Sequence, residues 1–141
     1  MLIFYKKILY IYYFIKAKEY LFDENILEAL EAFSRAEKYY NDDYQLYIYK
    51  GLCEFLLKLF DDSLLSFQKA LKMVHADKKL SSDEKNYLKK FIIEHLLDIL
   101  RILRCPTHNY DEYKNVYNGL KFNKNRINKN LFYDFPLEKD S

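Results

Sequence analysis

Two stretches of similar sequence decide the fold of this chain: ALEAFSRAEKYY, residues 29–40, and SLLSFQKALKMV, residues 63–74. Phe33 pairs with Phe67, and Ala36 with Ala70, at one common 34-residue separation. Further pairs with this separation are Tyr13 and Tyr47, Ala17 and Gly51, Ile26 and Phe60, Ala29 and Ser63, Leu30 and Leu64, and Arg35 and Lys69. Because a fixed period of this length marks repeat proteins, we expect two consecutive, equivalent helical hairpins.

The composition favours a helical fold. The chain has 141 residues, half of them hydrophobic and 18% aromatic, which suits one domain with a packed core. Only two glycines and two prolines are present, too few for the many tight turns of a β fold. The sequence therefore predicts an all-α protein.

Breaks in the apolar spacing predict the first four helices. The first covers residues 8–22, and the second resumes at Ile26 and ends before residues 41–43. A third helix includes residues 47–59, and Asp61 and Asp62 are expected to turn the chain into a fourth, from Ser63 to about His75.

Clearer signals mark the last two helices. Ser81 and Glu84 form a capping-box pattern, which predicts a fifth helix over residues 83–104. Pro106 follows Cys105 and stops that helix. Residues 110–120 are expected to form a short sixth helix.

The paired positions resemble the tetratricopeptide repeat (TPR) family, whose unit is a 34-residue helix–turn–helix. Residues 10–43 match its small and aromatic positions with Tyr13, Ala17, Tyr20, Ala29, Phe33 and Ala36. Residues 44–77 match with Tyr47, Gly51, Ser63, Phe67 and Ala70. The departures are Lys16 and Lys50 at aliphatic positions, Glu54 at an aromatic one, and Asn41 and His75 in place of the closing proline. An ordinary helical bundle is the alternative.

The resemblance implies a short right-handed solenoid of stacked hairpins over residues 1–122. Residues 83–120 would be a degenerate third hairpin, because Tyr117 lies well beyond one repeat period after Phe67. An unrelated capping hairpin is the alternative there. Residues 123–141 are expected to form a flexible tail, rich in Asn and Lys, with an aromatic segment at 131–137.

The resemblance also implies a binding surface, because the first helix of each unit lines the concave face on which family members hold a peptide or helix. Here that face would comprise Ile11, Phe14, Lys18, Leu21, Gln45, Ile48, Tyr49, Leu52 and Phe55. Since most of these side chains are apolar, we expect an apolar groove, covered by a partner segment, by a second copy of the chain or by the tail itself.

Catalytic and metal-binding patterns are missing from the sequence. The three histidines, His75, His95 and His108, fall on separate elements, and Cys105 with His108 forms a lone C-x-x-H pair. Two glycines leave no phosphate-binding loop. We therefore expect no enzyme activity, no cofactor and no metal.

Charge gives little support to nucleic-acid binding. The net charge is +2, and the basic residues of the tail, Lys121, Lys124, Arg126 and Lys129, would give only weak, salt-sensitive contacts. A nucleic-acid-associated helical protein is thus a minor alternative. The main expectation is a non-catalytic adaptor, co-chaperone or assembly factor. A secretion-type chaperone of the same repeat class is the second.

The N-terminus is unusually apolar. Its uncharged run, residues 8–15, is too short to span a bilayer and lacks a signal-peptide cleavage pattern. The two cysteines show no disulfide framework. We expect a cytoplasmic protein with no membrane span. Its apolar first residues suggest either that other repeats precede this end or that it forms a homodimer.

Overall fold

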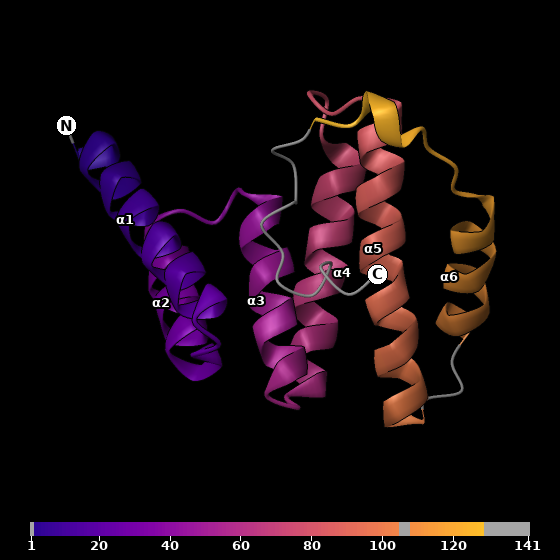
Figure 1. Ribbon diagram of the computed structural model, residues 1–141, viewed down its shortest axis with the longest axis horizontal. Helices are drawn as coiled ribbons and strands as arrows, with labels where there is room; N and C mark the ends of the chain where they lie inside the picture. The colour runs from indigo at the N-terminus through magenta and orange to yellow at the C-terminus, as the bar shows by residue number, and fades with distance from the viewer. Residues whose placement is uncertain (1, 105–107, 129–141) are drawn as a thin grey trace. The chain divides into compact units, whose positions relative to one another are not determined.

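The structure is a computed structural model that describes residues 2–104 and 108–128. It confirms an all-helical chain, with no strand in those residues. The elements are α1 (Leu2–Phe22), α2 (Ile26–Tyr39), α3 (Tyr44–Leu56), α4 (Phe60–Ala76), α5 (Ser82–Leu103), α6 (His108–Gly119) and a 3₁₀ turn, η1 (Lys124–Arg126) (Figure 1). Two compact units divide the chain, Met1–Ala70 and Leu71–Ser141.

The turns of the first two hairpins have the same backbone geometry at the 34-residue separation. Glu24 and Lys58 both adopt the left-handed conformation, with φ of 62° and 63°. The amide before each of them, of Asp23 and Leu57, donates to the carbonyl four residues earlier, at 3.1 and 3.0 Å. The hydrogen bonds donated by the amides of Glu24, Asn25 and Ala29 recur 34 residues later, where the amides of Lys58, Leu59 and Ser63 donate to the equivalent carbonyls. A left-handed residue is a common way to end a helix. Here it gives both hairpins the same turn at equivalent positions of the repeat.

Small residues bring α3 and α4 close together. Gly51 and Ser63 are both buried, and the Ser63 hydroxyl donates a hydrogen bond of 2.7 Å to the Gly51 carbonyl. A Cβ atom at Gly51 would lie 3.1 Å from the ring of Phe67. The equivalent positions of the first hairpin, Ala17 and Ala29, are fully buried too. The repeated small residues therefore permit close helix contact in both hairpins.

Aromatic side chains join the first hairpin to α3. The ring of Tyr49 stacks on Phe33 with centroids 5.6 Å apart and meets Phe14 edge-on at 5.8 Å. Nearby, the Tyr10 hydroxyl donates to the Asp43 carboxylate. Asp43 also caps α3 by accepting from the Gln45 amide at 3.0 Å. One acidic residue therefore begins α3 and ties it to α1.

Helix bounds differ from the sequence prediction in three of the first four helices. α3 begins at Tyr44 and ends at Leu56, three residues before the predicted start and end, because Asp43 caps it and the turn at Lys58 follows it. α1 begins at Leu2, nearly two turns earlier than expected, because the mostly apolar residues before Ile8 continue the helix. α4 begins at Phe60, so Asp61 and Asp62 lie in its first turn instead of in the preceding turn. Negative charge is favourable there because a helix N-terminus carries a partial positive charge.

In the second unit, α5 and α6 pack side by side (Figure 1). The predicted capping box is confirmed, since the Ser81 hydroxyl accepts from the Glu84 amide and the Glu84 carboxylate accepts from the Ser81 amide. Arg101 of α5 donates to the Tyr110 hydroxyl at 3.0 Å, and the Lys90 ammonium lies 4.9 Å from the Tyr117 ring centroid.

The first residues of the predicted tail make hydrogen bonds to the start of α5. The Asn123 amide donates to Asp83 at 3.0 Å, and the Asn128 amide donates to Glu84 at 3.1 Å. Both carboxylates belong to the first turn of α5. Residues 123–128 are thus held at the start of α5. The aromatic segment 131–137, Cys105 and the tail's Lys129 lie outside the described residues.

Candidate functional site

The nine predicted surface residues divide into a buried and an accessible group. Buried are Leu21, Ile48, Tyr49 and Leu52, none of which exposes more than 4% of its surface. Half-buried or exposed are Ile11, Phe14, Lys18, Gln45 and Phe55. The expectation that all nine side chains line an open face therefore needs correction: the four buried ones cannot touch a partner in this structure.

Packing explains the burial of Tyr49, whose ring contacts those of Phe14 and Phe33, which also contact each other, at the junction of the first hairpin with α3. Spacing along a helix cannot show such burial, because it depends on which other helices pack against the residue. The part of the predicted face that a partner can reach consists of the five accessible residues.

The accessible part of α1 combines aromatic, aliphatic and cationic side chains. The Lys18 ammonium lies 5.8 Å from the ring centroids of both Phe14 and Tyr49. Ile11 exposes 47% of its surface one helical turn before Phe14. A cation over aromatic faces is a stable arrangement, and it leaves the Ile11 side chain open to an apolar contact.

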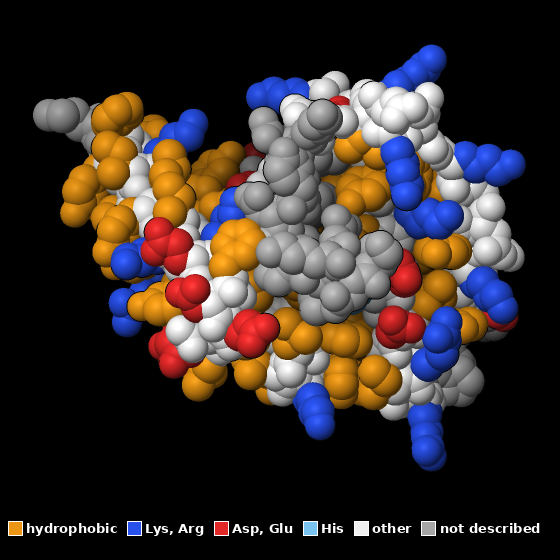
Figure 2. Space-filling model, in the orientation of Figure 1, with side chains coloured by type: hydrophobic (Ala, Val, Ile, Leu, Met, Phe, Trp, Pro, Cys, Tyr) orange, Lys and Arg blue, Asp and Glu red, His pale blue; other side chains and the backbone are white. Residues whose placement is uncertain are grey.

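An apolar stripe on α1 extends this surface toward the N-terminus. Phe4, Ile8, Ile11 and Ile15 follow each other at spacings of four, three and four residues, so they share one helix face. Their exposed fractions are 71%, 51%, 47% and 52%. Figure 2 shows hydrophobic side chains gathered over this part of α1. None of the helices within the described residues is both long and apolar enough to cross a bilayer.

A polar cluster between α2 and α3 was missed by the sequence reasoning. The Glu37 carboxylate accepts hydrogen bonds from the Tyr47 hydroxyl and the Lys50 ammonium, each of 2.8 Å. Burial opposes ionisation of Glu37, but these two hydrogen bonds prevail and lower its pKa. The Lys69 ammonium lies 4.3 Å from the Tyr47 ring centroid. The available signal was the recurrence of tyrosine and lysine at the repeat period.

A second polar cluster lies buried between α3 and α4. The Ser66 hydroxyl donates to the Glu54 carboxylate at 2.5 Å, and burial raises the pKa of Glu54. Burial, together with the nearby Glu54, raises the pKa of the Cys53 thiol to about 12. Because the thiolate is the reactive form of cysteine, Cys53 is a core residue and no nucleophile at neutral pH.

His75 and His95 each contact a different group. The His75 Nδ1 atom lies 2.8 Å from the Lys89 ammonium, and the His95 Nδ1 atom lies 3.0 Å from the Phe91 carbonyl oxygen. Within residues 2–104 and 108–128, no three His, Cys, Asp or Glu side chains are grouped closely enough to hold a metal ion.

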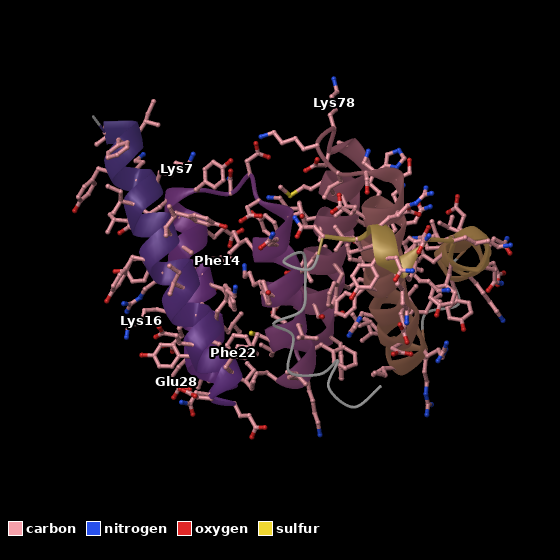
Figure 3. The ribbon with its side chains drawn as sticks, turned by 45° about the horizontal axis from the view of Figure 1, so that its top comes forward. Lys7, Phe14, Lys16, Phe22, Glu28 and Lys78 are labelled. Carbon is pink, nitrogen blue, oxygen red and sulfur yellow. The ribbon has the colours of Figure 1, made fainter. Side chains whose placement is uncertain are left out.

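An open cavity of about 300 Å³ lies between α1 and α2. Its lining consists of Tyr12, Tyr13, Lys16, Tyr20, Glu28, Glu31, Ala32 and Arg35. Figure 3 shows Lys16 and Glu28 at the same edge of the hairpin, with Phe14 on a different side of α1. The cavity is therefore separate from the face that carries Phe14 and Lys18.

Comparison with known proteins identified no relative: no family model, no curated protein and no solved structure matches the chain.

Proposed function

We propose that the chain is a non-catalytic protein–protein interaction module of the tetratricopeptide repeat class. The observation that carries this proposal is the recurrence of the whole hairpin turn at the 34-residue period, including its hydrogen bonds and its left-handed residue. The same period relates the small residues Ala17 and Gly51. Stacked helical repeats of this kind serve as binding surfaces.

The binding face of this proposal is the accessible apolar surface of α1, centred on Ile11, Phe14 and Lys18. Its partner is a peptide or helix with an apolar stripe of its own, because aliphatic side chains on the two surfaces would bury each other. Each large apolar side chain that becomes fully buried contributes about 1.5 to 3 kcal/mol before the cost of ordering the partner. Adaptors, co-chaperones and assembly factors of the cytoplasm are the functional classes that fit such a surface.

A secretion-type chaperone of the same repeat class is the second candidate, and the exposed apolar stripe supports it equally. Nucleic-acid binding has less support. Phe122, an aromatic residue beside the basic ones, packs edge-on against Tyr87 with centroids 5.3 Å apart. The backbone amide of the neighbouring Asn123 is bound to Asp83.

The proposal is tested by site-specific photocrosslinking in a lysate of the source cells. A benzophenone amino acid replaces Ile11 in one variant and Leu65 in a control, since Leu65 is an apolar, 66% exposed residue of another helix, α4. We expect a small, reproducible set of proteins to be crosslinked at position 11 and not at position 65. Adding Phe4→Glu and Ile15→Glu to the Ile11 variant should reduce those crosslinks about tenfold.

Identical crosslinked proteins at both positions would mean that α1 has no special role. Crosslinks at position 11 that persist in the presence of both glutamates would likewise contradict an apolar binding face.

A further inference from the structure

Tyr47, Lys50 and Lys69 form a site around the Glu37 carboxylate, which we call a seat. It is the starting point for a second binding surface, one that is independent of the apolar stripe. Inside the chain, Tyr47 and Lys50 of α3 bind the carboxylate of Glu37 from the preceding helix, α2. Lys69 of α4 completes this seat by lying over the Tyr47 ring. Three side chains from one hairpin thus receive an acidic residue of a neighbouring helix.

The same three side-chain positions recur one repeat period earlier in the chain. Tyr13 corresponds to Tyr47, Lys16 to Lys50, and Arg35 to Lys69. The Arg35 guanidinium lies 6.0 Å from the Tyr13 ring centroid, as its counterpart Lys69 lies over Tyr47. The first hairpin therefore carries a seat of similar composition, with an arginine where the second has Lys69.

The carboxylate that would fill this first seat is not supplied by a preceding helix of the described residues. One repeat period before Glu37 stands Ile3, which belongs to α1 itself. The acidic partner of Lys16 is Glu19, one turn away on the same helix, at 3.8 Å. Both of these side chains are largely exposed, so this ion pair is weak. Instead of a helix, the open cavity of about 300 Å³ lies in front of Tyr13 and Lys16.

The face of α1 around this seat is long enough to hold a helix. Tyr5, Leu9, Tyr12 and Lys16 follow each other at spacings of four, three and four residues and so form one stripe. Tyr5 and Tyr12 are 61% and 54% exposed. These residues extend the seat by two helical turns with apolar and aromatic surface, which a partner helix would bury.

We propose that the Tyr13–Lys16–Arg35 seat binds a glutamate-bearing helix of a different protein, which packs on α1 as α2 packs on α3. The acidic side chains Glu28 and Glu31 at the cavity disfavour a polyanion such as a phosphate group. The seat is better matched by a single carboxylate on a helix that also carries basic side chains. α2 itself is such a helix, with Arg35 and Lys38 beside Glu37.

A second copy of the chain fits this seat less well. Its Glu37 is already engaged by its own Tyr47 and Lys50. Pairing of two α1 helices would also bring together Lys6, Lys7 and Lys16 of both copies, and no acidic residue precedes Glu19. These like charges oppose association.

The test uses the full chain and a fluorescent, helix-stapled peptide with the sequence of residues 26–40, which carries Glu37. We expect saturable binding by fluorescence anisotropy. Glu37→Gln in the peptide and Lys16→Gln in the protein should each weaken binding about tenfold. The two changes together should reduce the affinity little more than either change alone, because both remove the same interaction. Lys16→Glu in the protein should be rescued by Glu37→Lys in the peptide. Glu28→Gln in the peptide and Lys58→Gln in the protein are matched controls that should leave affinity unchanged.

Several results would overturn the proposal. No saturable binding, or equal binding by the Glu37→Gln peptide, would show that the seat does not select a carboxylate. Loss of binding in Lys50→Gln but not in Lys16→Gln would show that the peptide displaces α2. Sedimentation that reveals a dimer abolished by Lys16→Glu would assign the seat to a second copy. Markedly tighter binding after deletion of residues 129–141 would assign it to the tail.

Discussion

Individual side chains set the balance of charge inside the first unit. Glu37 is half-buried and Glu54 is buried, and their pKa values move in opposite directions. Glu37 receives two hydrogen bonds, one of them from the Lys50 ammonium, so its ionised form is stabilised. Glu54 is 6% exposed and receives one from the Ser66 hydroxyl, so burial dominates and the neutral form is favoured.

This contrast predicts opposite effects of the same substitution on stability. Because the folded-state pKa of Glu54 is raised, ionisation destabilises the fold as the pH rises through that pKa. Glu54→Gln should therefore stabilise the protein by on the order of 1 kcal/mol at pH 7, and the gain should disappear toward pH 4. The measurement is the free energy of unfolding in urea over this pH range.

Glu37→Gln is the matched control for that experiment. Since the folded-state pKa of Glu37 is lowered, its stabilising effect is present above its unfolded pKa and is lost as the pH falls through the folded value. This variant should be less stable than the wild type by about 1 kcal/mol at pH 7 and should approach it in acid. Parallel pH trends in the two variants would refute the assigned environments.

Helix pairs depend on the size of the side chains at their contact. The capping box of α5 and the helical spacing of apolar residues are local features, and for that reason they could be predicted from the sequence. The closeness of α3 and α4 at Gly51 was expected from the repeat pattern as a small-residue position. What the pattern could not show is that the ring of Phe67 leaves so little space there.

Gly51→Val should therefore destabilise the protein by about 2 to 3 kcal/mol, because a branched side chain would collide with the Phe67 ring in a filled core. Thermal and urea unfolding monitored by circular dichroism measure the effect. Gly119→Val is the control, since a Cβ atom there has no neighbour within 4 Å, and it should change stability by less than about 0.5 kcal/mol. Equal losses in both variants would mean that helix propensity and not packing is being measured.

At the scale of the whole molecule, α1 presents a continuous exposed apolar surface. Leu2, Ile3, Phe4 and Tyr5 are each more than 60% exposed, and the stripe continues through Ile8 and Ile15. Exposed apolar surface that is continuous along a helix is typical of binding sites. It is also the property from which both candidate functions, adaptor and chaperone, are argued.

Removing part of this surface should change association and not folding. The double variant Ile8→Ser and Ile15→Ser should keep the wild-type melting temperature within about 2 °C, because both side chains are about half exposed. We expect it to bind less of the dye ANS and less of any protein that is crosslinked at position 11. A matched single variant, Leu65→Ser on α4, should leave both properties unchanged. A large drop in melting temperature would show that the stripe is part of the core.

The amino-acid sequence by itself determined the helical class, the 34-residue period, the first hairpin turn and the capping box at Ser81, because each depends on residues close together in the chain. Tertiary structure alone decided that Leu21, Ile48, Tyr49 and Leu52 are buried, that Glu37 is bound by Tyr47 and Lys50, and that residues 123–128 are held at α5. The physical reason is that burial and hydrogen bonding between helices depend on which surfaces meet, and spacing along one helix carries no record of its neighbour.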